Sequence, residues 1–88
     1  MNVEVLLFGK LRELATRKPV VSLTDGARLI DLFELLVKEY GADFGEEINH
    51  TERFNILING RYCNPLDDME APLKEGDVVA MLPLWAGG

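Results

Sequence analysis

The sequence predicts a single small α+β domain, in which a mixed sheet of about five strands carries one main helix on one face, in the order β-β-α-β-β-β. Apolar residues alternate in several short segments, the first at 2–8 and the last at 78–82, which indicates strands. Between 29 and 40 they recur at three- and four-residue spacing, which indicates an amphipathic helix. With 88 residues, 48% of them hydrophobic, the chain has room for one sheet and about one helix.

The first part of the chain contains two strand signals separated by a break. Residues 2–8 form a strand with one fully apolar face, and Phe8 falls on the opposite face. Gly9 ends this strand, and residues 10–15 can form at most a short helical turn. Residues 20–23 make a second short strand.

The helix signal between 29 and 40 comes with signals for its ends. Thr24 or Asp25 offers an N-cap oxygen, and Gly41 is placed as a C-terminal stop. One way to bury the apolar stripe is to lay this helix across one face of the sheet, with the first and last strands adjacent in its centre. The other face of the sheet would then be partly open.

The second half of the chain predicts the remaining strands. Residues 54–58 alternate as a third strand, and Asn59-Gly60 favours a tight hairpin into residues 61–63. Residues 65–72 are expected to be irregular. A turn at 73–77 leads into the last strand, 78–82.

The sequence ends in Gly87-Gly88, shortly after the last strand. Glycine loses more backbone entropy on ordering than any other residue, so this ending favours a backbone that must enter a space without room for a Cβ atom. We therefore expect a domain of residues 1–82 and an extended C-terminal tail of residues 83–88. The alternative is an incidental end, because chain termini are commonly disordered.

The composition excludes several classes of function. A net charge of −6 lacks the basic face of a nucleic-acid-binding protein. No apolar run approaches the ~18 residues of a membrane span, and the first residues lack a signal-peptide pattern, so we expect a cytoplasmic protein. The single cysteine, Cys63, and the single histidine, His50, predict neither an internal disulfide nor a metal site.

Several short patterns occur together along the whole chain. They are Val5-Leu6-Leu7-Phe8-Gly9-Lys10-Leu11-Arg12-Glu13-Leu14, Asp25-Gly26-Ala27 before the helix, Asn59-Gly60, Leu73-Lys74-Glu75-Gly76-Asp77-Val78-Val79, and Pro83 with Gly87-Gly88. In this order they resemble the MoaD branch of the MoaD/ThiS sulfur-carrier family. These are ubiquitin-like β-grasp proteins, and the branch is typified by the small subunit of molybdopterin synthase.

The resemblance implies a chemistry for the tail. An E1-like adenylyltransferase (MoeB-like) would use ATP and Mg²⁺ to join AMP to the carboxylate of Gly88, and a sulfur nucleophile would then displace AMP to leave a thiocarboxylate. Gly87 would let the backbone pass a narrow channel. The sulfur would be donated in molybdopterin (molybdenum or tungsten cofactor) biosynthesis, with the large subunit of molybdopterin synthase (MoaE-like) as the second partner. The chain alone would bind no cofactor and would not be catalytic.

The resemblance also implies a docking surface. Phe8 and Leu82 would form an exposed patch that both partners bind, and Arg12 would pair with a partner carboxylate. Pro83 and Trp85 complete the expected partner-binding set, since tryptophan is enriched at binding hot spots. The alternatives are that Phe8 closes the end of the core, that Arg12 is solvated, and that Trp85 folds back on the open face.

The sequence departs from the family pattern in two places, which leaves the sulfur acceptor open. Leu84 stands where the family often has a second proline, and residues 45–53 form a longer and more acidic loop than a minimal connection needs. A carrier for thiazole (thiamine) synthesis or tRNA thiolation is one alternative. A ubiquitin-like protein modifier is another, and a plain interaction module with incidental terminal glycines is a third.

Overall fold

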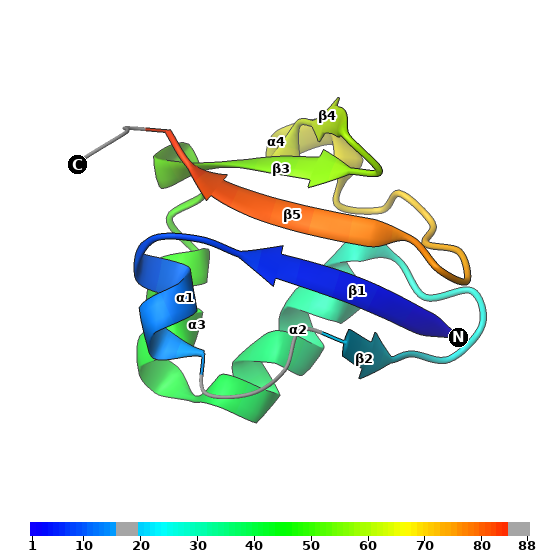
Figure 1. Ribbon diagram of the computed structural model, residues 1–88, viewed down its shortest axis with the longest axis horizontal. Coiled ribbons are helices and arrows are strands. Elements are labelled where there is room, and N and C mark those ends of the chain that lie inside the picture. The colour runs from blue at the N-terminus through cyan, green and yellow to red at the C-terminus, as the bar shows by residue number, and fades with distance from the viewer. Residues whose placement is uncertain (16–19, 85–88) are drawn as a thin grey trace.

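The protein folds as a five-stranded mixed sheet with its helices packed on one face (Figure 1). The computed structural model describes residues 1–15 and 20–84. The strands are β1 (Asn2–Leu7), β2 (Val20–Ser22), β3 (Phe54–Ile58), β4 (Arg61–Cys63) and β5 (Val78–Pro83). Their order is β2-β1-β5-β3-β4, and β1 and β5 run parallel while the other neighbours are antiparallel. This confirms the predicted fold class and the pairing of the first and last strands.

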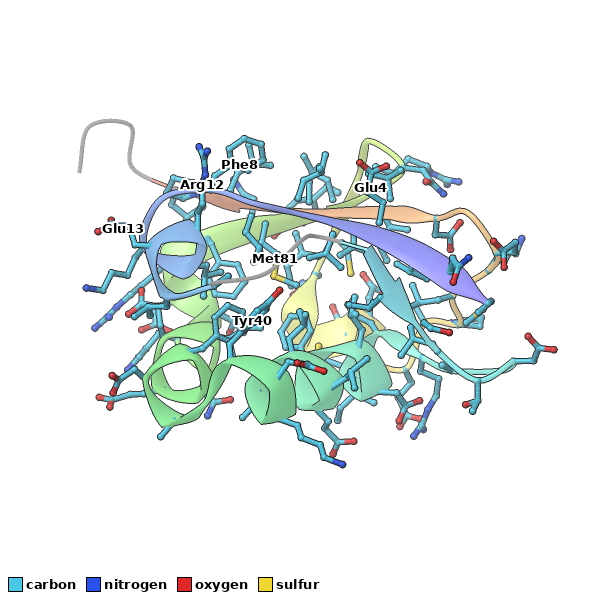
Figure 2. The ribbon with its side chains drawn as sticks, turned by 60° about the horizontal axis from the view of Figure 1, so that its bottom comes forward. Glu4, Phe8, Arg12, Glu13, Tyr40 and Met81 are labelled. Carbon is cyan, nitrogen blue, oxygen red and sulfur yellow. The ribbon has the colours of Figure 1, made fainter. Side chains whose placement is uncertain are left out.

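The core lies between the sheet and the helix face. Fully buried strand residues such as Val5, Ile56 and Met81 pack in one cluster with Leu32 and Leu36 of α2 (Leu29–Tyr40). Because side chains alternate along a strand, the residues between these positions must point to the other face of the sheet. Figure 2 shows Met81 and Tyr40 between the sheet and the helices.

Two helices occupy segments that the sequence analysis treats as loops. α3 (Ala42–Ile48) directly follows α2, and it overlaps the segment expected to be an acidic loop. It forms because Phe44 and Ile48, one turn apart, are both buried in the core, and the rings of Phe44 and Tyr40 lie 5.0 Å apart between centroids. The expectation that residues 65–72 are irregular is wrong for the first half of this segment, where α4 (Pro65–Asp68) forms one turn, and holds for residues 69–72.

Two further short helical segments flank the sheet at one end. They are α1 (Lys10–Leu14), which matches the expected short helical turn, and the 3₁₀ helix η1 (Thr51–Arg53), which leads directly into β3. Leu11 anchors α1 because its side chain is buried in the core cluster.

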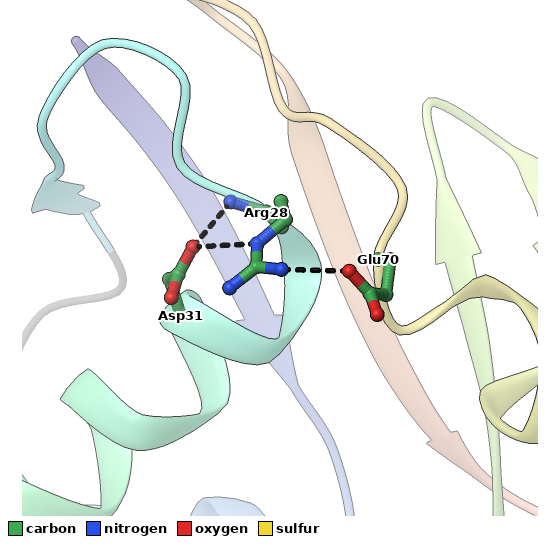
Figure 3. A network of polar contacts seen from close by, with 3 residues as sticks. All are labelled: Arg28, Asp31 and Glu70. Carbon is green, nitrogen blue, oxygen red and sulfur yellow. Dashed lines mark hydrogen bonds and ion pairs between the residues drawn. The ribbon is translucent and has the colours of Figure 1, made fainter.

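The predicted cap of α2 at Thr24 or Asp25 is wrong, because the N-cap residue is Arg28. Before the helix begins, the backbone pairs with the distant segment 71–73 through hydrogen bonds such as Leu73 N–H to the Ala27 carbonyl (2.9 Å). The Asp31 carboxylate then accepts the Arg28 backbone N–H at 2.8 Å, which is the carboxylate half of a capping box (Figure 3).

The same network joins the start of α2 to the segment after α4. The Arg28 guanidinium contacts Asp31 and donates to Glu70 at 2.7 Å (Figure 3). The backbone N–H and the guanidinium of Arg28 lower the pKa of Asp31 below its usual value. All three side chains are partly or largely exposed to solvent. The network therefore orients the start of α2 relative to the segment after α4, and it contributes little to the stability of the fold.

The Gly-Asp-x-Val pattern forms the turn that starts β5. The Asp77 carboxylate accepts the backbone N–H of Lys74 at 2.8 Å and the side-chain amide of Asn59 at 2.9 Å. The backbone N–H of Gly76 donates to the carbonyl of Asn2 at 2.8 Å. The beginning of β5 is therefore tied to both of its neighbours, β1 and the β3–β4 hairpin.

Candidate functional site

The face of the sheet that the helices leave open carries a continuous apolar row. The strand registers pair Leu6 with Ala80, Ala80 with Leu57, and Leu57 with Tyr62. These positions alternate with buried ones, so their side chains share the open face across β1, β5, β3 and β4. Tyr62 is 66% exposed.

Phe8 and Leu82 extend this row toward the end of the sheet where β1 and β5 finish. The Phe8 N–H donates to the Met81 carbonyl at 3.2 Å, so the parallel ladder continues one residue past β1 and brings Phe8 beside Leu82. Phe8 is 41% exposed and points away from the helices (Figure 2), as strand alternation predicts. We call Leu6, Phe8, Leu57, Tyr62, Ala80 and Leu82 the apolar patch.

Arg12 stands at the rim of the apolar patch. It lies on α1, and Figure 2 shows it on the same side of the sheet as Phe8 and Glu4. Its side chain is exposed, and its guanidinium makes no hydrogen bond or ion pair with the described residues. An unpaired guanidinium beside apolar surface suits a carboxylate on a partner, because guanidinium binds carboxylate through two parallel hydrogen bonds.

The chain leaves the sheet at this same rim. Pro83, the last residue of β5, pairs with Phe54, and the Leu84 N–H donates to the Arg53 carbonyl at 3.0 Å. Proline has no N–H with which to continue the ladder toward β1, so β5 ends here. β1 and β5 are parallel, and Figure 1 shows both arrows ending at the same side of the sheet.

The end of the tail lies beyond the described residues. Trp85, Gly87 and Gly88 are predicted site residues, and the structure says nothing about their positions. Of the other predicted site residues, Phe8, Leu82, Arg12 and Pro83 gather at one rim of the sheet. The sequence analysis missed Leu57 and Tyr62. The Asn59-Gly60 turn could have indicated them, because a two-residue turn fixes the register that places these two side chains opposite one another.

The described side chains offer little chemistry of their own. In residues 1–15 and 20–84 no three histidine, cysteine or acidic residues gather as a metal site. Cys63 is buried, and its burial together with the charge of Asp68 raises the pKa of its thiol. A protonated thiol is a poor nucleophile. None of the described helices has the length and apolar character needed to cross a bilayer.

Comparison with known proteins identifies the family. The model of the ThiS family matches residues 5–88, nearly the whole chain. The chain belongs to the ThiS family. The resemblance to MoaD/ThiS carriers inferred from the sequence is thereby confirmed, and the described topology is that of the ubiquitin-like β-grasp fold.

Individual members of the ThiS family that resemble this chain have different names. Small archaeal modifier protein 3 of Haloferax volcanii is 34% identical over 92 residues, and the match covers all of both chains. The molybdopterin synthase sulfur carrier subunit of Chlamydomonas reinhardtii is 36% identical over 89 residues, also over all of both chains.

Among solved structures, a protein–protein complex of subunits 1 and 2 of the molybdopterin-converting factor from Helicobacter pylori contains a similar chain. That chain is 26% identical, with a TM-score of 0.61 over all of both chains.

Proposed function

We propose that this protein is a sulfur carrier whose terminal carboxylate, on Gly88, is adenylated and converted to a thiocarboxylate, and that it donates this sulfur as the small subunit of molybdopterin synthase. The observation that carries the proposal is the position of the chain exit. β5 leads from the apolar patch directly into the tail, so a partner that binds the patch lies within reach of the chain end. The four residues beyond Leu84 span at most about 14 Å when extended.

The chemistry requires an activating partner. A free carboxylate has a pKa of about 3.5, is ionised in the cell and resists nucleophiles, because oxide is a poor leaving group. Attack of the carboxylate oxygen on the α-phosphorus of ATP releases pyrophosphate and forms an acyl adenylate. Hydrosulfide then attacks the acyl carbon and AMP leaves with the bonding electrons, which gives the thiocarboxylate. Mg²⁺ on the partner neutralises the phosphate charge of ATP.

The apolar patch and Arg12 supply the contacts for docking. Burying an exposed aromatic such as Phe8 removes apolar surface from water. Arg12 would fix the orientation of the bound partner through a charged hydrogen bond. We propose that an E1-like adenylyltransferase (MoeB-like) and a MoaE-like large subunit use this same surface in turn. The H. pylori complex of subunits 1 and 2 supports a partner of the second kind.

Intact-mass spectrometry tests the proposal. The protein is incubated with an E1-like adenylyltransferase of the same organism, ATP, Mg²⁺ and sodium sulfide. We expect a mass gain equal to the replacement of one oxygen by sulfur, absent without ATP and absent in a variant that ends at Gly87. An unchanged mass with every E1-like enzyme of the organism would overturn the proposal. Adding the large subunit and a pterin precursor should return the mass to that of the carboxylate.

The relationship to small archaeal modifier protein 3 favours a second candidate function. In a protein modifier, a lysine amine rather than hydrosulfide would attack the activated glycine, and the product would be an isopeptide bond. Tryptic peptides that carry the terminal residues of this chain on lysines of other proteins would establish this function. Their absence from cells in which the thiocarboxylate accumulates would leave the carrier function alone.

A further inference from the structure

Gly9 lies between the apolar patch and α1, in a conformation and a space that disfavour any residue with a Cβ atom. Its φ is +65° and its ψ is −137°, a region that side chains with L-chirality rarely adopt. A Cβ atom placed on Gly9 would lie 3.3 Å from Cγ of Pro83. This is tighter than ordinary van der Waals contact, and the ring of a proline cannot rotate away as a flexible side chain would.

The opposite side of this exit is held by β3. Pro83 pairs with Phe54, and the Leu84 N–H donates to the Arg53 carbonyl at 3.0 Å. The end of β5 is thus confined between the backbone of Gly9 on one side and the η1–β3 junction on the other. A Cβ at Gly9 would push Pro83 and draw Leu84 away from its acceptor.

We propose that Gly9 is a positioning residue: by packing its backbone against Pro83 it keeps Leu84 bonded to Arg53 and so sets the point and direction from which the tail leaves the sheet. The consequence for activation rests on the proposed function. The tail beyond Leu84 reaches at most about 14 Å, so a small change in the position or direction of the exit moves the carboxylate away from ATP in a partner bound to the apolar patch.

The comparison of Gly9→Ala with Gly76→Ala isolates this contact. Gly76 also has a positive φ, +82°, but a Cβ there would meet nothing within 4 Å. Both variants place an alanine at a positive φ, which strains the backbone. Only in Gly9→Ala does the added Cβ also come too close to Pro83. The first measurement is hydrogen exchange of the Leu84 amide, which needs no partner and no tail chemistry.

We expect Gly9→Ala to accelerate exchange of the Leu84 amide about tenfold or more relative to Gly76→Ala, through local opening at the exit. In a Pro83→Ala background the Cγ atom is gone, and the effect of Gly9→Ala on Leu84 should shrink. Equal exchange of Leu84 in Gly9→Ala and Gly76→Ala would overturn the proposal. If Gly9→Ala does not fold, Pro83→Ala alone must accelerate Leu84 exchange, and unchanged exchange there would overturn it equally.

Kinetics of thiocarboxylate formation distinguish positioning from docking. We expect Gly9→Ala to lower kcat about tenfold, with KM for the carrier within about twofold, because docking is kept and the reacting geometry is lost. A raised KM with unchanged kcat would place Gly9 in the docking surface and contradict the positioning role. If the wild-type protein gains no sulfur, the proposed function fails, whereas the exchange of Leu84 still decides whether Gly9 positions the exit.

Discussion

Phe8 lies just past the end of β1, where strand alternation places it in the proposed docking surface. Its neighbours Val5 and Leu7 face or line the core, while Phe8 turns its ring to the open face at the end of β1, beside the start of the tail. Alternation alone places it there. The alternative that Phe8 closes the end of the core does not fit its 41% exposure.

We expect Phe8→Asp to weaken binding of the activating enzyme by at least about tenfold, because a charge replaces apolar surface that the partner would bury. Phe8→Leu is the matched control and should keep the affinity within a few-fold. Isothermal titration calorimetry measures both, and thermal unfolding should give the same Tm for the two variants within about 3 °C, since the site is exposed. An affinity that does not change in Phe8→Asp would remove Phe8 from the docking surface.

At the scale of elements, α3 depends on a close approach to α2. A Cβ atom on Gly45 would lie 2.9 Å from Cγ1 of Val37, so the two helices pack more closely here than any other residue allows. Phe44 and Ile48, on either side of this contact, are fully buried. Gly45 therefore sets how deeply α3 enters the core.

Gly45→Ala should lower the free energy of unfolding by about 1–3 kcal/mol, because overpacking forces the helices apart. Glu46→Ala, at an exposed neighbouring position of α3, should change it by less than about 0.5 kcal/mol. Urea denaturation measures both. In a Val37→Ala background the cost of Gly45→Ala should fall, and an equal cost in both backgrounds would show that the Val37 contact is not its cause.

The elements differ in how far the sequence could predict them. The strands and α2 carry clear periodicity, and the Asn59-Gly60 turn implies the register that aligns Leu57 with Tyr62. α3 has a glycine in its centre and acidic residues around it, and it is too short to be stable alone, so packing of Phe44 and Ile48 decides its formation. The cap at Arg28 was missed because it depends on pairing with a segment more than forty residues away.

At the scale of the whole molecule, the sequence predicted the fold, and the residues that it proposed for docking gather at one rim of the sheet, but it did not predict how the exit is built. The contacts of Gly9 with Pro83 and of Leu84 with Arg53 bring together segments remote in sequence, and no local pattern signals them. The family resemblance supplied the proposed role of the last two glycines, which periodicity could not.

We expect Gly87→Val to abolish sulfur loading while the Tm stays within error, because we expect the tail to take no part in the core and a side chain at this position to block entry to the partner's channel. Ala86→Val, next to it, is the matched control and should retain loading. Intact mass and a thermal melt measure the two properties. Loss of folding in Gly87→Val would show that the tail belongs to the domain.

The central place of β5 has a mechanical consequence. It is hydrogen-bonded along its length to β1 on one side and to β3 on the other. Tension applied along the axis of β5 therefore loads both hydrogen-bond ladders in shear, so that many bonds share the force at once instead of opening one after another. The Asp77 turn anchors the far end of the strand against the same pull. The folded domain can therefore resist unfolding when a partner pulls on its last residues.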